Sequence, residues 1–196
     1  LFLAAMADIT GDFEESIKEF SKVLAVRGKV IPSTLETVQL KAKYSDGSEI
    51  IGEANIPQPG RTIERIFLEP SSAKAVPEAL EAIKSADLVV LGPGSLYTSV
   101  IPNLLVSPMI DALVETQAQR VYVCNVMTQP GETDGYTAGD HVAALLKHAG
   151  YRRIIDYVIV NETPISPAQA EKYREQQAFP VEVDRTRLES MGLAVV

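Results

Sequence analysis

Two polar loops near the middle of the chain contain the groups best suited to bind a ligand. The first spans residues 92–99 and offers glycines and hydroxyl groups, namely Gly92, Gly94, Ser95 and Thr98. Glycines let the main chain approach a ligand closely, and successive backbone N–H groups in such a turn form an anion-binding concavity. A helix predicted to begin near Ser99 adds its positive end. These features predict a site for a phosphate or a sugar hydroxyl.

A purely structural interpretation of this first loop stays open. Turns from a strand into a helix often contain glycine because the backbone geometry requires it. The loop lacks both the Gly-Lys pair of a Walker A sequence and the spacing Gly-x-Gly-x-x-Gly. The residues alone therefore do not separate a phosphate-binding loop from a tight turn.

The second loop, residues 125–134, is rich in side-chain amides and acids. Its polar side chains are Asn125, Gln129, Glu132, Thr133 and Asp134. The amides could read polar groups of a substrate, or could hold the two loops together. The two acids could ligate a hard cation such as Mg²⁺, or could simply face solvent.

The remaining residues of reactive type near these loops favour packing roles. Tyr136 could stack on a nucleobase or pack over the start of the next helix. His141 and His148 have no partner at metal-ligand spacing and are predicted at the rim of the fold, where His148 suits the end of a helix. Cys124 is predicted to be buried in a strand. We find no nucleophile with a clear base in the sequence.

The segments around these loops predict an α/β fold. Apolar strands at 87–91, 120–124 and 155–160 alternate with helices, which is typical of a parallel sheet with right-handed crossovers. Ligands bind at the carboxyl ends of such strands, where both loops begin. The helices are predicted at residues 77–85, 107–115, 138–149 and 166–178, and short edge strands at 181–183 and 193–196.

Residues 36–69 predict a small antiparallel sheet that is inserted in, or attached to, the α/β core. Residues 38–44 alternate apolar and polar side chains, Asp46-Gly47 predicts a hairpin turn, and residues 63–68 form another strand. Before this region, an amphipathic helix is predicted at 12–24, capped by Asp12. Its apolar stripe is Phe13, Ile17, Phe20 and Leu24. The cations Arg27 and Lys29 of the following loop could face a phosphate or be solvated at the surface.

The bulk composition limits the class of protein. The chain has 196 residues, a net charge of −8 and one cysteine. The negative charge argues against a nucleic-acid or acidic-lipid partner, and one cysteine excludes an internal disulfide. No apolar run approaches the roughly 18 residues of a membrane span, so the cytosol is the expected compartment. The oligomeric state, including a homo-oligomer, stays open.

Several motifs resemble one known family. Residues Leu91–Leu105 and Tyr122–Asp134 are similar to two long motifs of the gluconeogenesis-factor (YvcK-type) family. Shorter similarities are Ile9–Phe13, Val26–Thr34, and Asp140-His141 followed by His148–Gly150. Together these matches cover nearly the whole chain. The family belongs to a wider CofD-like group typified by 2-phospho-L-lactate transferase, an enzyme of deazaflavin-cofactor synthesis.

The resemblance implies a Rossmann-like three-layer α/β fold, in which residues 1–196 form one CofD-like domain and residues 36–69 a β-rich insertion. It implies a cytosolic bacterial protein that binds a UDP-sugar of the UDP-N-acetylglucosamine type. Such a protein is needed for cell shape and for growth on gluconeogenic carbon sources, and has no established catalysis. Tyr136 would stack on the uracil. The other residues expected at the ligand are Thr34, Gly92, Gly94, Ser95, Thr98, Asn125, Gln129, Thr133 and Arg174.

The transferase branch implies an alternative function. A phospholactyl-type group would be transferred from a nucleotide-linked donor, with Mg²⁺ held by Asp12 or Asp134. The first loop reads Gly-Pro-Gly-Ser-Leu-Tyr where the transferases have a Gly-Pro-Ser-Asn-Pro type of sequence, and this difference argues against phospholactyl transfer. A purely structural scaffold is a third interpretation, and it predicts no ligand at the strand ends.

The family pattern includes a glycine-rich nucleotide loop before the point that Leu1 matches. Because Leu1–Met6 reads as the middle of an apolar helix, we expect the chain to be the C-terminal portion of a longer one. The preceding portion would supply half of the site and the first strands of the sheet. A protein that physically starts at Leu1 is expected to fold poorly and bind nucleotide weakly, and an intact-mass measurement tests where the protein starts.

Overall fold

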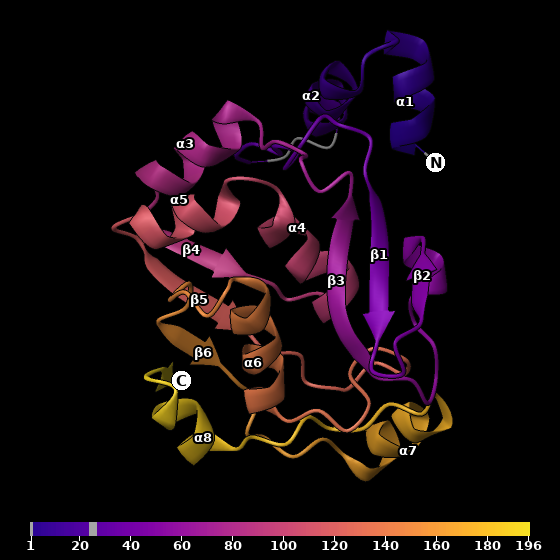
Figure 1. Ribbon diagram of the computed structural model, residues 1–196, viewed down its shortest axis with the longest axis vertical. Coiled ribbons are helices and arrows are strands. Elements are labelled where there is room, and N and C mark those ends of the chain that lie inside the picture. Colours follow the sequence, from indigo (N-terminus) through magenta and orange to yellow (C-terminus); the bar gives the residue numbers. More distant parts are fainter. Residues whose placement is uncertain (1, 24–26) are drawn as a thin grey trace.

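Two β-sheets of different type face each other across a layer of helices in the computed structural model of the chain, which describes residues 2–23 and 27–196 (Figure 1). One sheet is parallel, with the strand order β4-β5-β6-β7, and the other is antiparallel, with the order β2-β1-β3. The prediction of an α/β fold with a mainly parallel sheet and a small antiparallel region is confirmed.

The parallel sheet forms from the apolar segments that the sequence analysis identified. Its strands are β4 (Leu88–Leu91), β5 (Gln119–Val123), β6 (Tyr157–Ile159) and β7 (Ala194–Val195). The helices that precede or connect them are α3 (Pro77–Ser85), α5 (Met109–Glu115), α6 (Ala138–His148), α7 (Pro167–Glu175) and α8 (Arg185–Ser190). The segment predicted as an edge strand at 181–183 forms an isolated bridge instead, between Glu182 and Thr137.

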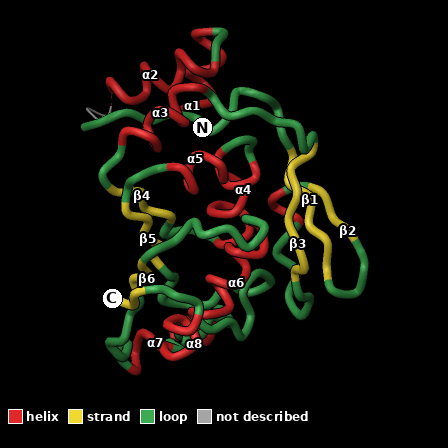
Figure 2. The backbone as a smooth tube through the Cα atoms, turned by 60° about the vertical axis from the view of Figure 1, so that its left-hand side comes forward, coloured by secondary structure: helices red, strands yellow, loops and turns green. Residues whose placement is uncertain are grey.

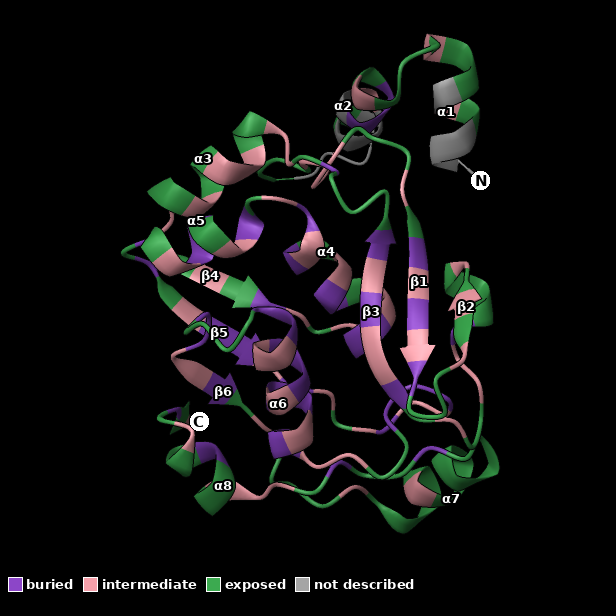
Figure 3. Ribbon diagram, in the orientation of Figure 1, coloured by how far each residue is buried: buried purple, intermediate pink, exposed green. Residues whose placement is uncertain are grey.

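The antiparallel sheet forms as the alternating pattern and the turn residues predict. The hairpin of β1 (Gln39–Tyr44) and β2 (Glu49–Ile51) turns at Gly47, whose φ is 83°, and β3 (Ile63–Glu69) pairs with the other edge of β1. A short 3-10 turn, Glu53–Asn55, follows β2. Along β1, alternate residues are buried, and Figure 3 shows this inward-facing row in purple. The sheet therefore buries one face against the helices, as period-two patterning requires.

The helix layer between the sheets contains α4 (Ile101–Leu105) and α6, and Figure 2 shows it from the side. Helix α6 is bonded directly to the free edge of β3. The Nε2 atom of His148 accepts the N–H of Ile66 at 2.9 Å, and the Lys147 ammonium donates to the carbonyl oxygen of Glu64 at 2.9 Å. These two contacts fix the distance between the antiparallel sheet and the helix that carries part of the candidate site.

The opposite face of the parallel sheet is open in the described part of the chain. Leu88 and Val90 of β4 and Ile159 of β6 are about half exposed, whereas Leu91, which points to the helix layer, is buried. The apolar sequences of these strands predict burial on both faces, and this exposed face differs from that expectation. Parallel sheets normally have both faces covered because their strands are apolar on both sides.

The N-terminal helices lie at the end of the molecule away from α7 and α8 (Figure 1). Helix α1 (Phe2–Thr10) is followed by α2 (Phe13–Val23), and Asp12 caps α2 by accepting the N–H of Glu15 at 2.8 Å, as predicted. Ile17 is buried, but Phe13 is half exposed, so the predicted stripe is only partly buried. The Phe20 side chain and Leu24 lie outside the described residues.

Two predicted helix starts are corrected. The helix after the first loop begins with a π-helical turn at Leu96–Val100 and continues as α4, so it starts three residues before Ser99. The next helix begins at Met109, after Pro108, and Ser107 does not cap it. The backbone of Ser107 bonds to the backbone of Ala73 and Ala75 instead. None of the helices built by residues 2–23 and 27–196 has the length and apolar character that a membrane crossing needs.

Candidate functional site

The loops that follow β4 and β5 meet at one edge of the parallel sheet. The register pairs Leu91 with Tyr122 and Val123 with Ile159, so the carboxyl ends of three neighbouring strands lie together. In Figure 1 the chain leaves these strands toward α4, α6 and α7. This is the edge where open α/β sheets bind ligands.

The first loop needs glycine at its first position. Gly92 has a φ of 81°, a region that disfavours side chains, and a Cβ there would lie 3.2 Å from the Val123 carbonyl oxygen. The Gly92–Pro93 peptide bond is cis. In the turn that follows, the N–H of Val100 reaches back to the Ser95 carbonyl oxygen at 2.9 Å. The loop is therefore a tight, well-determined turn into a helix.

The buried carboxylate of Glu132 closes this turn. It is 5 % exposed, and it accepts the Tyr97 N–H at 3.1 Å and the Thr98 hydroxyl at 2.8 Å. Burial raises the pKa of Glu132, and the hydrogen bonds from Thr98 and Tyr97 offset part of that increase. Glu132 is thus neither in a solvated loop nor free to hold a cation. The Glu132 carboxylate of the second loop therefore occupies the place beside the start of the π-helical turn where an anion could otherwise bind.

The predicted polar residues hold the two loops together. The amide of Asn125 donates to the Gly94 carbonyl oxygen at 3.0 Å, and the amide of Gln129 donates to the Ser95 hydroxyl at 2.8 Å. The buried Thr133 hydroxyl accepts the backbone N–H of Gln129 at 2.8 Å. The structure therefore brings together five predicted residues from two loops, and their groups bond to one another within the protein.

The antiparallel region approaches the second loop at Gly131. Its carbonyl oxygen accepts the N–H of Gln58 at 3.3 Å, and a Cβ at Gly131 would lie 2.6 Å from the Gln58 nitrogen. Asp134, which is exposed, accepts the Gly131 N–H at 2.7 Å with one carboxylate oxygen. Glycine is required here by this close approach as well as by its φ of 79°.

Tyr136 packs over the start of α6. Its hydroxyl bonds to that of Tyr97 at 2.7 Å, and its ring meets the His141 ring edge to face, with centroids 5.6 Å apart. Burial raises the pKa of both tyrosines. The aromatic contacts leave Tyr136 half-buried, with part of its surface still accessible.

Both histidines are buried, so their prediction at the rim is wrong. His141 is completely buried, and its Nδ1 bonds to the Thr137 carbonyl oxygen at 2.9 Å, while its Nε2 has no hydrogen-bond partner among the described residues. Burial lowers the pKa of His141 and lowers that of His148 to about 4. Their spacing of seven residues places them on one face of α6 that points to the core.

Acidic side chains already occupy the N-terminus of α6. Thr137 and Asp140 form a capping box, and Asp184 accepts the N–H of Gly139 at 2.7 Å and the hydroxyl of Thr137 at 2.8 Å. Burial alone would raise the pKa of Asp140, but the Thr137 N–H and the Arg187 guanidinium, 2.8 Å away, lower it overall. This helix end is satisfied by the protein itself.

Cys124 is not an activated nucleophile. It is buried, as predicted, and burial raises the pKa of its thiol to about 12. A thiol with so high a pKa carries almost no thiolate at neutral pH. Of the residues that the structure describes, no three from the types His, Cys, Asp and Glu are placed to hold a metal ion.

Some backbone donors of the first loop remain free. Among the described residues, none accepts the N–H groups of Gly94, Ser95 or Leu96, and Gly94 and Ser95 are partly exposed. A hollow of about 370 Å³ lies against Gly92 and Pro93. A second hollow of about 350 Å³ brings Thr34 near Thr98, and the Thr34 hydroxyl accepts the Glu36 N–H at 3.1 Å.

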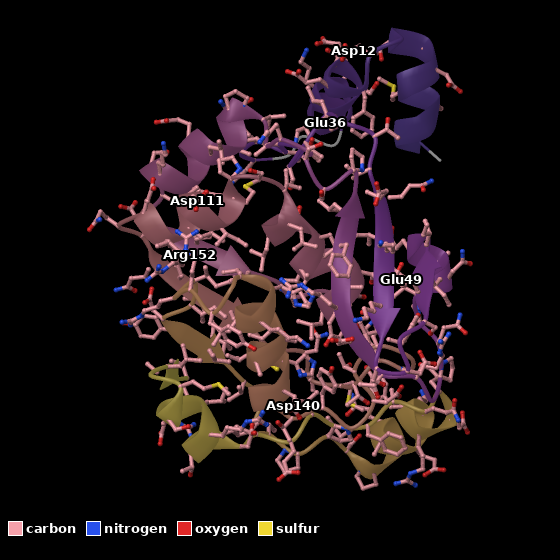
Figure 4. All side chains as sticks on the ribbon, viewed as in Figure 1. Asp12, Glu36, Glu49, Asp111, Asp140 and Arg152 are labelled. Atoms are coloured by element: carbon pink, nitrogen blue, oxygen red, sulfur yellow. The ribbon has the colours of Figure 1, made fainter. Side chains whose placement is uncertain are left out.

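Other predicted residues lie apart from these loops. Arg174 is exposed on α7, and its guanidinium pairs with Glu171 at 2.6 Å instead of with either loop. Asp12 lies near the end of the molecule opposite Asp140 (Figure 4). A further hollow, about 580 Å³, lies against Ile17, Val30 and Pro77, so the most voluminous one described is also away from the strand ends.

Known proteins similar to this chain identify its family. A family model described as 2-phospho-L-lactate transferase CofD matches residues 1–196. The chain belongs to the CofD family. Within it, the gluconeogenesis factors of Bacillus subtilis and Halalkalibacterium halodurans are each 48 % identical to this chain over 196 residues, all of it. The chain covers 62 % and 61 % of those two relatives.

The CofD-family chain also matches a solved structure of the same group. A crystal structure of a UPF0052 family member from Bacillus halodurans has a TM-score of 0.94 and 48 % identity, and the match covers 100 % of this chain and 63 % of that protein. The chain thus spans about three fifths of the length of the relatives it matches. The predicted resemblance to gluconeogenesis factors is confirmed.

Sequence reasoning missed several residues that shape the site of this CofD-family chain. Tyr97 and Asp184 were not singled out, and Glu132 was given no buried role. Glu132 reaches partners 34 and 35 residues away, and Asp184 reaches partners 45 and 47 residues away, so spacing in the sequence carries no signal of these bonds. The one usable signal was the position of Glu132 in a long loop between two glycines, Gly131 and Gly135.

Proposed function

We propose that the chain binds a nucleotide sugar of the UDP-N-acetylglucosamine type at the carboxyl ends of β4, β5 and β6, and that binding, not turnover, is its role in gluconeogenic growth and cell shape. The observation that carries the proposal is the pair of partly exposed N–H groups at Gly94 and Ser95, which no described residue accepts. Such a pair of backbone donors is complementary to the oxygens of a diphosphate.

The surrounding bonds support a preformed anion site. Asn125 and Gln129 of the second loop hold the first loop in place, so the N–H groups of Gly94 and Ser95 need no ordering when a ligand arrives. Preorganised donors lose less entropy on binding than mobile ones. The adjacent hollow at Gly92 gives the ligand room beside the loop.

Several side chains that could act as nucleophiles are engaged in hydrogen bonds or are not activated. The Ser95 hydroxyl accepts from Gln129, the Thr98 hydroxyl donates to Glu132, and the Cys124 thiol has a pKa of about 12. These roles support a binding protein over an enzyme that forms a covalent intermediate.

Titration calorimetry with UDP-N-acetylglucosamine tests the proposal, and two variants at one position isolate the main-chain donor. Ser95 has φ −57° and ψ 125°, which proline can adopt, so Ser95→Pro removes its N–H without changing φ. Ser95→Ala is the control, because it removes the hydroxyl and keeps the N–H. We expect Ser95→Pro to weaken binding at least tenfold and Ser95→Ala less than threefold. No heat at millimolar ligand refutes the proposal.

The family model favours a second candidate, transfer of a phospholactyl-type group from a nucleotide-linked donor with Mg²⁺. Magnesium in such enzymes is often held by one or two carboxylates together with substrate phosphates. Asp134 fits the carboxylate role, because one of its oxygens is bonded to the Gly131 N–H and the residue is exposed. Mg²⁺-dependent turnover that is lost in Asp134→Asn would support this candidate, and turnover that persists would refute the role of Asp134.

A further inference from the structure

A groove of about 570 Å³ lies directly beside the bonded loops, at the ends of β5 and β6. Three segments of the chain line it. They contribute Val126 after β5, Asn161, Thr163 and Ile165 after β6, and Pro180 and Val181 before α8. Its position is again the carboxyl edge of the parallel sheet, but its walls differ in kind from the glycine loop.

The groove walls are mainly aliphatic and carry no free charge. No lysine or arginine is among the described residues that line it, and the one acid, Glu162, is paired with Arg185 at 2.9 Å. Such walls do not compensate a phosphate, whose burial needs donors or cations. They suit an uncharged ring, which gains free energy from apolar contact.

One rim of the groove offers both a hydrogen-bond acceptor and a hydrogen-bond donor. The Asn161 amide nitrogen donates to the Thr163 carbonyl oxygen at 2.8 Å, which orients the amide and leaves its oxygen as an acceptor. The Thr163 hydroxyl has no partner among the described residues and can donate. An acceptor beside a donor matches the edge of uracil, which presents an N–H next to carbonyl oxygens.

The groove and the glycine loop are adjacent through two consecutive residues. Asn125 bonds to the Gly94 carbonyl oxygen, while the next residue, Val126, lines the groove. Val126 is also fixed by its carbonyl oxygen, which accepts the N–H of Val181 at 2.9 Å. One ligand could therefore place a charged part at the glycine loop and an uncharged ring in the groove, because Asn125 and Val126, which connect the two places, are adjacent and both held by hydrogen bonds.

From this placement we infer that the groove binds the uncharged pyrimidine base of the nucleotide whose phosphates lie on the glycine loop. The inference rests on the proposed function and assigns its base subsite to Val126, Asn161, Thr163 and Ile165. It is an alternative to stacking of the base on Tyr136, whose ring meets His141 edge to face.

Calorimetry with three probes tests the assignment: UDP-N-acetylglucosamine, uridine, and N-acetylglucosamine 1-phosphate, which lacks the base. Val126 is 44 % exposed, so Val126→Asp adds a charge to the groove without burying one, and Ile165→Asp is a second variant. Ile51→Asp, at a half-exposed aliphatic residue of β2, is the matched control. Melting temperatures near that of the unmodified chain identify variants that remain folded.

We expect both groove variants to weaken UDP-N-acetylglucosamine at least tenfold and to abolish uridine binding. The affinity for N-acetylglucosamine 1-phosphate should stay within twofold, and Ile51→Asp should change nothing. If the folded variants bind the UDP-sugar within twofold of the unmodified chain, the groove assignment is wrong and the proposed function stands. If the unmodified chain binds no UDP-sugar, the proposed function fails; uridine binding that the variants lose then still supports the groove, and no uridine binding overturns it.

Discussion

The two halves of the strand-end region use their polar groups in opposite ways. In the bonded half, residues 92–99, Asn125 and 127–137, side chains such as Glu132 and Asn125 hydrogen-bond other parts of the protein and are largely buried. In the open half, residues 161–165 with Val126 and 180–183, the side chains are mostly exposed and line a groove. The bonded half is built like a core, and the open half like a surface.

The difference shows where recognition resides. The polar side chains that cluster most densely in the sequence maintain the shape of the first loop. The groups left for a ligand are main-chain N–H groups in the bonded half and aliphatic walls in the open half. Mutations in the bonded half should therefore change stability first, and mutations in the open half should change affinity first.

The largest effect is expected from Glu132→Ala, which breaks the bonded half. It leaves the Tyr97 N–H and the Thr98 hydroxyl without their acceptor and creates a cavity, so we expect a loss of about 4 kcal/mol in the free energy of unfolding. Urea denaturation measures it. Glu53→Ala, at an exposed acid, is the control, with an expected change below about 0.5 kcal/mol. If Glu132→Ala lowers the free energy of unfolding by less than about 1 kcal/mol, the bonded half does not depend on its buried hydrogen bonds as the comparison of the two halves requires.

The next largest effect is a pH dependence that leaves both halves intact. Burial first, and then the charges of Arg65 and Lys147, lower the pKa of His148 to about 4 in the folded chain, below its usual 6.5. The unfolded chain therefore binds more protons, and stability that is complete above pH 6.5 is lost as the pH falls toward 4. The expected loss at pH 4 is about 3 kcal/mol.

Urea denaturation between pH 7 and pH 4 tests this expectation with His148→Gln, which does not titrate. The variant should have a flatter dependence over this window, because the Ile66 N–H can still find an acceptor there. Equal slopes for the unmodified chain and the variant would show that His148 is not responsible.

A smaller effect distinguishes two asparagines that end neighbouring strands. Asn125 is partly buried and bonds across to Gly94, so Asn125→Ala should lower stability by about 1 kcal/mol. Asn161 is exposed and, within the described part of the chain, its side chain bonds only to its own turn, so Asn161→Ala should cost less than about 0.5 kcal/mol. Thermal melts compare them, and equal losses would remove the distinction between the halves.

The smallest effect is expected at Arg174. Its exposed pair with Glu171 contributes little to stability, and it follows Ala170, which lines the groove, by one helical turn. Arg174→Ala should leave the melting temperature unchanged and weaken UDP-N-acetylglucosamine about twofold, more at low salt because an exposed charge is screened. Lys172→Ala is the control, and an equal effect there would remove any specific role for Arg174.

Much of the fold could be predicted because its signals are local. The Asp46-Gly47 turn, the Pro77 start of α3 and the Thr137–Asp140 capping box each require only a few neighbouring residues, and each is present. The start at Leu96 was missed because a π-helical turn, with its bond from Val100 to Ser95, does not follow the usual helical spacing.

The site was predicted less completely because its decisive contacts are long-range. The sequence indicated which residues gather at the strand ends, but not that Glu132 would be buried under the first loop. It also did not reveal that His148 would be buried against β3, since this depends on how the two sheets dock. A histidine in the last turn of a helix is equally consistent with solvent, and only the tertiary arrangement decides.

The contacts of α6 with β3 also bear on self-association. A sheet edge with unpaired N–H and carbonyl groups can recruit a strand from another molecule, which is a route to aggregation. On β3 the Ile66 N–H and the Glu64 carbonyl oxygen, two of these groups, are taken by His148 and Lys147. The last turn of α6 therefore hinders the addition of a strand at this edge. Protonation of His148 would remove the acceptor of the Ile66 N–H and leave that group free to pair with another strand.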